Sequence, residues 1–284
     1  MTGHQIRLIV IAAVLALVGC APNHSGSATI SGELKKFQGL SGKIDIAGGT
    51  AHLPVMNEAV KRIHAANPGL RITVAGGGSG VGVKKLGEGL VEIGNTGRAV
   101  TDKEKEAHGL ISFPFALDGV SIIVHPANPI TGLSTEQMKK LYAGEIANWK
   151  EVGGPDGAVH LVMRDESSGT REVFWEILLG KGLISPAANV AASSGAVKVA
   201  VGRDPLAIGY TSMGHVDDTV KTIAIDGETP TRENALSGKY RVTRKLYMNT
   251  KGSPGELART FIDYIRGPEG DTIVREAGFI PVRQ

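Results

Sequence analysis

The amino-acid sequence predicts an α/β fold that is built of two lobes. From Lys43 onward, short runs of β-branched residues alternate with segments of helical periodicity. Glycine and small hydroxyl residues gather at three of the transitions from strand to helix. The length of 284 residues and the hydrophobic content of 42% are sufficient for a substantial core, and no internal repeat of fixed period interrupts the pattern.

Composition and motifs exclude several classes of function. The 31 Lys and Arg residues nearly balance the 28 Asp and Glu residues, and no long basic run marks a nucleic-acid surface. The chain has one Cys and no clustered metal-ligand spacing, so we expect neither a disulfide within the chain nor a metal site. Gly-x-Ser-x-Gly and the nucleotide phosphate loop are absent as well, so we expect neither an enzyme nor a bound cofactor.

The N-terminal segment has the pattern of a secretory signal. Arg7 precedes an apolar run, residues 8–18, that is shorter than the roughly 20 residues needed to span a bilayer. The run ends in Leu-Val-Gly-Cys, which resembles a bacterial lipobox and predicts that residues 1–19 are removed and Cys20 is lipidated. The alternative is a plain signal peptide that contains a Cys. Residues 20–41 contain Pro, Ser and Gly with little periodicity, which predicts a flexible tether.

Three pairs of a strand and a helix follow the tether. In the first predicted helix the apolar residues recur at helical spacing, as in a helix that packs on a sheet. Thr101 with Glu104 and Ser134 with Gln137 have the spacing of a capping box, which predicts a helix start at each. The predicted pairs are 44–46 with 54–65, 71–74 with 81–86, and 91–93 with 101–107.

The rest of the pattern gives a C-terminal helix and the limits of the lobes. Residues 256–266 place apolar side chains on one side and meet Gly-Pro as a stop signal. The strand-like runs 119–124 and 207–211 are the candidates for the places where the chain crosses between lobes. We therefore predict a first lobe of residues 42–118 and 213–284 and a second lobe of residues 119–212.

The glycine-rich transitions predict an anion site. Gly48-Gly49-Thr50, Gly76-Gly77-Gly78-Ser79-Gly80 and Ser167-Ser168-Gly169-Thr170 each follow a predicted strand and precede a helix. A helix start exposes unpaired N–H groups, glycine permits close approach, and Ser or Thr adds a hydroxyl donor. Each segment alone is equally consistent with an ordinary capped loop. Three in one chain favour a shared cage for an anion.

Two charged residues extend this interpretation. Arg164 lies four residues before Ser168, and its planar guanidinium suits two oxygens of a carboxylate, sulfate or phosphate. Asp118 lies between two strand-like runs, where the alternative is a simple turn residue. Beside an anion, a buried carboxylate would accept a hydrogen bond from a protonated oxyanion and repel an unprotonated one.

With these motifs the chain resembles the phosphate-binding proteins of bacterial ABC transporters. The similarity runs in order over nearly the whole chain after the signal segment. The segments that carry it are GGT, AGGGSGVGVKKL, EIGNTGR, LDGVSIIVHPANP, LSTEQMKKLYAGEIANWKEVGG, RDESSGTREVF and LAIGYTSMG. The resemblance implies a periplasmic-binding-protein fold of type II, in which two lobes close on one phosphate ion.

The resemblance also implies which residues bind the ion. Carried over by position, donors in the first lobe are the Thr50 hydroxyl, the Thr50 and Ala51 amides, and Ser79. The donors implied in the second lobe are Arg164, Ser168, Gly169 and Thr170.

One position departs from the family pattern. After Ile-Gly the family usually has a hydroxyl or a proton-accepting carboxylate, whereas this chain reads Thr96-Gly97-Arg98. We therefore expect Asp118 to be the proton acceptor, with Arg98 as its ion-pair partner at the site.

The function implied is extracytoplasmic binding of inorganic phosphate and its delivery to the ABC permease subunits of the inner membrane. The protein is expected to be a monomer held by its lipid on the periplasmic or cell-surface side of a bacterial membrane. Two alternatives stay open, namely a binding protein for another tetrahedral oxyanion and a phosphate sensor without a transport role. A sugar ligand is disfavoured because aromatic residues make up only 5% of the chain.

Overall fold

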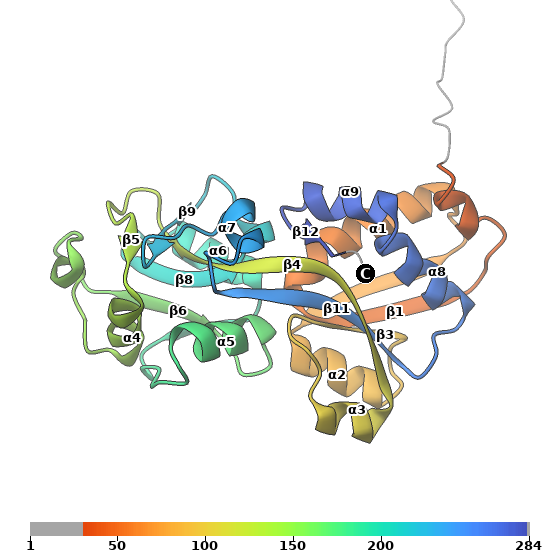
Figure 1. The fold of residues 1–284 in the computed structure, drawn as a ribbon, viewed down its shortest axis with the longest axis horizontal. Helices are drawn as coiled ribbons and strands as arrows, with labels where there is room; N and C mark the ends of the chain where they lie inside the picture. Colours follow the sequence, from red (N-terminus) through yellow and green to blue (C-terminus); the bar gives the residue numbers. More distant parts are fainter. Residues whose placement is uncertain (1–30, 283–284) are drawn as a thin grey trace, which may run out of the picture. The chain divides into compact units, whose positions relative to one another are not determined.

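The computed structural model describes residues 31–282, in which one long, curled sheet is covered by helices on both faces (Figure 1). The predicted signal peptide, Cys20 and the first part of the tether lie outside the described residues. The strands are β1 (Lys43–Gly48), β2 (Arg71–Gly77), β3 (Ile93–Thr96), β4 (Leu110–Val124), β5 (Gly132–Leu133), β6 (His160–Arg164), β7 (Asn189–Ala191), β8 (Ala207–Ser212), β9 (Lys221–Thr222), β10 (Ala224–Ile225), β11 (Thr243–Lys251) and β12 (Ile280–Pro281).

Helices follow most of the strands, as the alternating pattern predicts. The capping boxes at Thr101 and Ser134 are confirmed, because each hydroxyl accepts the amide three residues on and the Glu or Gln side chain accepts in return. The α-helices are α1 (Leu53–Ala66), α2 (Ser79–Gly87), α3 (Asp102–His108), α4 (Thr135–Ala143), α5 (Gly169–Val173), α6 (Ser194–Gly202), α7 (Arg232–Leu236), α8 (Glu256–Ile265) and α9 (Pro268–Glu276). A π-helical turn, Phe174–Leu178, continues α5.

The strand order along the sheet is β2-β1-β3-β11-β4-β8-β6-β7. β1 runs parallel to β2 and β3, and β6 runs parallel to β7 and β8. The two long strands β4 and β11 pair antiparallel in the middle. The order places two parallel αβ units at the two ends of the sheet and joins them through β4 and β11.

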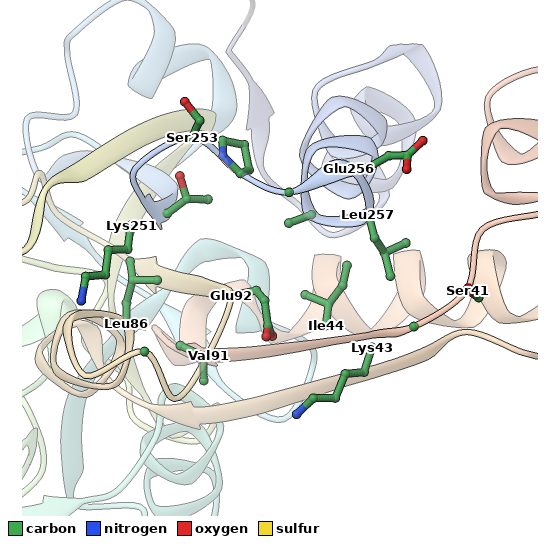
Figure 2. Close-up of a pocket in the computed structure, with 16 residues that line it drawn as sticks. Ser41, Lys43, Ile44, Leu86, Val91, Glu92, Lys251, Ser253, Glu256 and Leu257 are labelled. Carbon is green, nitrogen blue, oxygen red and sulfur yellow. The ribbon is translucent and has the colours of Figure 1, made fainter.

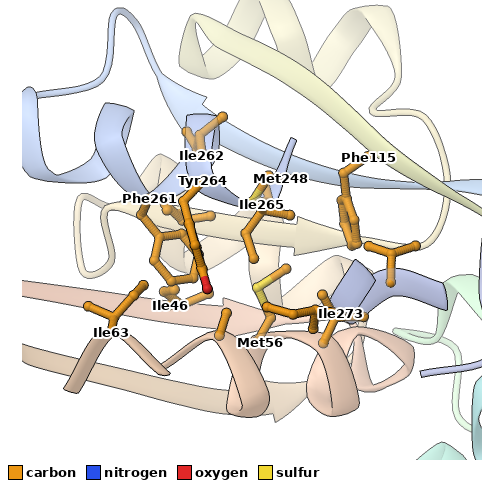
Figure 3. Packing of buried hydrophobic residues seen from close by; sticks show 14 of the residues in the cluster. Ile46, Met56, Ile63, Phe115, Met248, Phe261, Ile262, Tyr264, Ile265 and Ile273 are labelled. Carbon is orange, nitrogen blue, oxygen red and sulfur yellow. The ribbon is translucent and has the colours of Figure 1, made fainter. Parts of the chain in front are cut away.

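The largest hydrophobic cluster lies at the first end of the sheet, which we call the first lobe. Its side chains come from β1, β3, β4 and β11 and from α1, α8 and α9 (Figure 3). Ile44 and Ile46 of β1 face this cluster, whereas Ala47 faces a smaller cluster beneath α2, because successive side chains of a strand alternate between faces. Both faces of this end of the sheet are therefore covered.

A second large cluster lies at the other end, which we call the second lobe. Trp149, Phe174 and Tyr210 are fully buried there, and the Phe174 and Tyr210 rings stack with centroids 4.0 Å apart. Val197 and Val201 of α6 pack on the opposite face of the same strands. Each lobe thus has its own core. β4 contributes side chains to both cores, and β11 begins beside the second core and contributes to the first.

The chain crosses between the lobes within these two strands. In β4, Phe115 and Ala116 belong to the first cluster, whereas Val120 and Ile122 belong to the second. The predicted crossing at 119–124 therefore lies close to the observed one. The predicted return at 207–211 is wrong, because that run is β8 and pairs with β4 and β6 inside the second lobe.

The return crossing occurs at the start of β11. Tyr240 and Val242 pack in the second cluster, and Leu246 and Met248 pack in the first. Residues 216–242 therefore belong with the second lobe instead of the first, where the sequence placed them. The reason is that β9 pairs with β4 and β10 pairs with β5, and these contacts connect segments far apart in the sequence.

The second half of the predicted tether is also folded. Leu34–Phe37 form a 3₁₀ turn that packs on the first lobe. The Phe37 ring is fully buried and meets Tyr264 edge to face, with ring centroids 5.6 Å apart. Asn67 holds this turn through its side-chain amide, which donates to the carbonyls of Phe37 and Leu40. The burial of one aromatic side chain, Phe37, therefore orders a segment whose polar composition predicted a flexible tether.

Replacing Phe37 by Ala tests this anchor. Loss of a buried aromatic side chain should lower the free energy of unfolding by about 3 kcal/mol, because it removes buried apolar area and leaves a cavity. Chemical denaturation followed by circular dichroism measures the change. The matched control is Leu236→Ala, a Leu that is 62% exposed, which should change stability by less than about 0.5 kcal/mol. Equal effects of the two substitutions would contradict the packing of residues 34–37.

Candidate anion site

Three helix starts and the ends of two strands meet around one small cavity between the lobes. From the first lobe come the turn before α1 and the start of α2, and from the second lobe come the end of β6 and the start of α5. The lining residues are Gly49, Thr50, Ala51, Gly78, Ser79, Gly97, Arg164, Ser168, Gly169, Thr170 and Arg244. The structure therefore brings together Thr50, Ala51, Ser79, Arg164, Ser168, Gly169 and Thr170 of the residues that the sequence singled out, and it leaves Arg98 and Asp118 off the lining.

The two lobes touch directly beside this cavity. The Gly80 amide donates to the Ser167 carbonyl at 2.9 Å, and the Ser167 hydroxyl donates to the Gly77 carbonyl at 2.7 Å. Gly169 lies so close to the opposite helix that a Cβ there would stand 2.3 Å from the Ser79 Oγ atom. A side chain at position 169 would hold the lobes apart, and this explains why the start of α5 needs glycine.

Arg164 supplies a buried positive charge at the cavity. It is 1% exposed, and its guanidinium is aimed by the Ala191 carbonyl, which accepts from Nε at 2.9 Å, and by the Ala192 carbonyl, which accepts from Nη2 at 3.1 Å. Its Nη1 reaches across to the Thr50 hydroxyl at 3.0 Å. Burial lowers the pKa of Arg164, and Asp165 opposes that shift. The guanidinium is thus fixed in place before an anion arrives.

The cavity hydroxyls are oriented as donors. Ser79 Oγ accepts the Gly97 amide at 2.9 Å, and Ser168 Oγ accepts the Arg171 amide at 3.3 Å. Thr50 Oγ1 accepts the Ser194 amide at 3.2 Å as well as the Arg164 guanidinium. A hydroxyl that accepts a hydrogen bond still has its own proton to donate to another partner. Amides, hydroxyls and a guanidinium therefore line the same cavity, which is the chemistry of an oxyanion site.

Asp118 is not the ligand acceptor that the sequence suggested. It is fully buried, and its Oδ2 atom accepts from Arg244 Nε at 2.8 Å and forms an ion pair with Arg244 Nη2 at 2.8 Å. Its Oδ1 atom accepts from the Ser212 hydroxyl at 2.8 Å and from the Met213 amide at 3.2 Å. Burial raises the pKa of Asp118, and Arg244 opposes that shift. The carboxylate accepts from protein donors on both oxygens and does not line the cavity.

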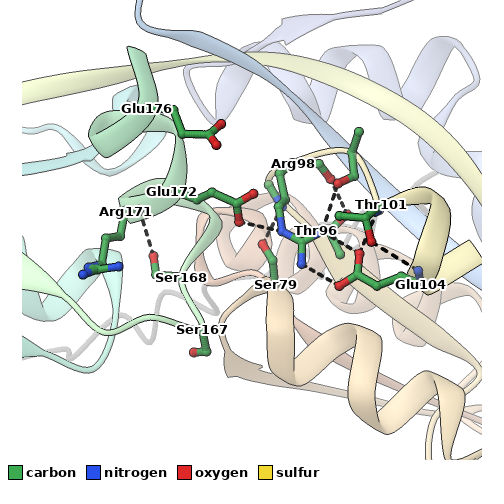
Figure 4. Close-up of polar contacts among 12 residues, drawn as sticks. Ser79, Thr96, Arg98, Thr101, Glu104, Ser167, Ser168, Arg171, Glu172 and Glu176 are labelled. Carbon is green, nitrogen blue, oxygen red and sulfur yellow. Dashed lines mark hydrogen bonds and ion pairs between the residues drawn. The ribbon is translucent and has the colours of Figure 1, made fainter. Parts of the chain in front are cut away.

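Arg98 does not pair with Asp118 either. Its guanidinium binds Glu104 at 2.7 Å within the first lobe and Glu172 at 2.7 Å across the gap in the second lobe (Figure 4). Glu104 and Glu172 raise the pKa of Arg98. The prediction of Arg98 as the partner of Asp118 is therefore wrong, and Arg98 is not among the residues that line the cavity. The nearby carboxylates hold it outside the cavity as a clamp between the lobes.

Arg244 is the functional candidate that the sequence reasoning missed. It lies on β11 directly opposite Asp118 of β4 in the register of the sheet. The surrounding sequence, RVTRKLYMNT, carries no glycine or hydroxyl motif that marks it as a site residue. Only the pairing of two strands that are 126 residues apart places it at the cavity.

A larger cavity of about 430 Å³ lies in the first lobe and is lined by residues of β1, β11 and α8 (Figure 2). Its cations are engaged within the protein, because Lys43 Nζ donates to Asp45 at 2.9 Å and Lys251 Nζ donates to the Gly87 carbonyl at 2.9 Å. Among residues 31–282 we find no cluster of side chains that could hold a metal ion. Over the same residues no helix is both long and apolar enough to span a membrane.

Comparisons with known proteins agree with this geometry. The model of the PBP superfamily domain matches residues 24–269. The chain is 33% identical over 288 residues to the phosphate-binding protein PstS of Bacillus subtilis strain 168, covering 99% of this chain and 95% of that one. It is 30% identical to PstS of Borreliella burgdorferi, covering 84% of this chain and 90% of that one.

Solved structures give the same result. A putative phosphate ABC transporter substrate-binding protein from Clostridium perfringens, with bound phosphate, is 35% identical with a TM-score of 0.81, and the match covers 85% of this chain and all of that one. An ABC-type phosphate transport receptor from Vibrio cholerae is 32% identical with a TM-score of 0.67, covering 84% of this chain and 99% of that one. The predicted periplasmic-binding-protein fold is confirmed.

Substitution of Asp118 tests the buried ion pair. Asp118→Asn should lower the free energy of unfolding by about 3 kcal/mol, because it leaves the Arg244 charge buried without its counter-ion. The double variant Asp118→Asn with Arg244→Gln removes both charges and should recover part of that loss. Denaturant unfolding of the two variants measures both effects. A single variant as stable as the parent would contradict the pairing.

Proposed function

The chain belongs to the PBP superfamily and to the family of the PstS phosphate-binding proteins, and from this premise we propose that it binds inorganic phosphate between its lobes and delivers it to an ABC permease. We infer that its role is binding without catalysis. The observation that carries the proposal is the cage of donors around Arg164, which come from three helix starts in two lobes. The names of the relatives support phosphate as the anion.

Closure of the lobes gives the mechanism. An anion that enters between Thr50 and Arg164 replaces their mutual hydrogen bond and takes up donors from both lobes. The contacts of Ser167 with Gly77 and Gly80 and the ion pair of Arg98 with Glu172 then hold the lobes together around it. The permease would bind the closed form, because only that form presents the surfaces of both lobes in a fixed arrangement.

The site residues that we propose are the cavity donors Thr50, Ala51, Ser79, Arg164, Ser168, Gly169 and Thr170. Arg98 acts indirectly, because its ion pair with Glu172 holds the two lobes together. The protein is further proposed to act as a monomer on the extracytoplasmic side of a bacterial membrane, held there by lipid on Cys20.

Binding is tested by the melting temperature of the full chain in mild detergent with phosphate, arsenate, sulfate or molybdate. Phosphate at 100 times its dissociation constant should add about 2.7 kcal/mol to the free energy of unfolding. Arg164→Ala should weaken binding by about 100-fold, since it removes the buried cation that faces the anion. The matched control is Arg171→Ala, because that guanidinium lies over the Trp175 ring, 5.9 Å from its centroid. Absence of any stabilisation by millimolar phosphate would refute the proposed function.

The lipid anchor is tested by labelling cells that express the chain with a radioactive fatty acid. The protein should carry the label and fractionate with membranes, because the acyl chains insert into the bilayer. Cys20→Ser should lose both properties. An unlabelled, freely soluble product of the parent chain would indicate a plain signal peptide.

A further inference from the structure

We propose that Arg244 is a second cation of the anion site and that, together with Gly97, it makes the site specific for a fully deprotonated tetrahedral oxyanion. This inference rests on the proposed function and names the ionic form of its ligand. In the family that the chain resembles, the position of Gly97 usually holds a hydroxyl or a carboxylate that accepts a proton from the ligand. In this chain the same space is taken by a donor.

The geometry of Arg244 supports this role. Its side chain is 3% exposed, lies on the cavity lining and reaches the Gly97 carbonyl with Nη1 at 3.3 Å. A Cβ at position 97 would stand 2.7 Å from the same Nη1 atom. A carboxylate at position 97 and the guanidinium of Arg244 therefore compete for one place, and the glycine admits the guanidinium.

Arg244 also keeps a donor in reserve. Asp118 neutralises its charge at 2.8 Å and is not among the residues that line the cavity. Its Nη2 atom is fully buried and lies 2.8 Å from Asp118 Oδ2, although that contact lacks the geometry of a hydrogen bond. The guanidinium has more N–H donors than Asp118 and the Gly97 carbonyl engage, so an anion oxygen in the cavity can accept from those that are left.

Among the described residues that line the cavity, several groups that could accept a ligand proton are already engaged by the protein. No carboxylate is among them. The hydroxyls of Ser79 and Ser168 each already accept a backbone amide and have a proton to donate onward. The carbonyls of Gly49, Gly78 and Gly97 already accept from His52, Gly82 and Arg244.

The charged and titratable groups around Arg244 do not change this balance. Asp118 accepts hydrogen bonds from Ser212, Met213 and Arg244, and Asp165 accepts from Ser167 and lies off the cavity lining. Burial lowers the pKa of His52 to about 3, and the nearby charge of Arg244 acts in the same direction. Burial likewise lowers the pKa of His215, whose Nε2 contacts the Thr50 carbonyl at 3.0 Å.

The remaining cations are engaged elsewhere. Arg98 is neutralised by Glu104 and Glu172 outside the cavity. The charges that face an entering anion are therefore those of Arg164 and Arg244, and both histidines stay neutral near neutral pH.

Two consequences follow for the ligand. A proton on phosphate would point at a donor, so the monoanion is rejected and the dianion is bound. The affinity for phosphate should therefore be highest at a pH above the second pKa of phosphate, and it should fall as the pH drops below that pKa. Sulfate has no proton to place, and the cage has no carboxylate to repel it. An unpaired buried polar group can reject an analogue by a factor of about 10⁴, and we expect no such rejection of sulfate by this site.

The experiment is calorimetric titration of the full chain with phosphate and with sulfate between about pH 5.5 and about pH 8. The phosphate dissociation constant should rise about tenfold for each pH unit below the second ionisation of phosphate, because binding then requires loss of one proton. Sulfate is the internal control, since it stays a dianion across this range, and its dissociation constant should not change. At the upper pH the two ligands should bind within about tenfold of each other, which is about 1.4 kcal/mol.

Variants locate the effect at Arg244. Arg244→Gln should weaken the binding of both dianions by about 10- to 100-fold, the worth of a hydrogen bond to a charged group. Since this variant leaves Asp118 unpaired, the double variant Asp118→Asn with Arg244→Gln is measured beside it, and the melting temperature reports folding. The double variant Gly97→Asp with Arg244→Gln places an acceptor in the vacated space. It should flatten the pH dependence of phosphate binding and reject sulfate.

The outcomes separate this inference from the proposed function. Phosphate binding that is independent of pH, or rejection of sulfate by about 10⁴ in the parent chain, overturns the inference and leaves the proposed function intact. Unchanged binding of both anions in the folded Arg244 variants also overturns it. Binding of sulfate without binding of phosphate supports a cage of donors only and overturns the proposed function. Failure of both anions to bind overturns both.

Discussion

The buried ion pair between Asp118 and Arg244 is the contact on which the rest of the arrangement depends. These residues face each other where β4 and β11 pass from one lobe to the other, so the pair lies at the crossing and at the cavity together. A buried guanidinium without a counter-ion would be costly, and a buried carboxylate without donors equally so. The pair fixes the two crossing strands to each other and turns the remaining face of the guanidinium toward the cavity.

The cavity uses few full charges because oriented dipoles supply most of its donors. Residues at three helix starts line the cavity, and the Ser79 and Ser168 hydroxyls there accept from backbone amides. Such donors require little reorganisation when an anion arrives, and the interior strengthens each of them. The formal net charge of only +3 is consistent with this construction, because the protein does not depend on a broad positive field to hold its ligand.

Local signals in the sequence predicted the fold and most of the cavity. The capping boxes and the glycine-hydroxyl transitions each act within a few residues, and the structure places them as expected. The errors concern contacts between distant segments. The return crossing at β11, the partner of Asp118 and the burial of Phe37 all depend on strand register or on tertiary packing, and neither leaves a periodic trace in the sequence.

Phosphorus-31 NMR of phosphate bound to the full chain tests the central claim most directly, because the chemical shift reports the ionic form of the ligand. At about pH 6, where free phosphate is mostly the monoanion, the cage of donors with Arg164 and Arg244 predicts a bound signal at the position of the dianion. A bound signal at the position of the monoanion would contradict the account of the site. Absence of a bound signal at any pH would contradict phosphate binding itself.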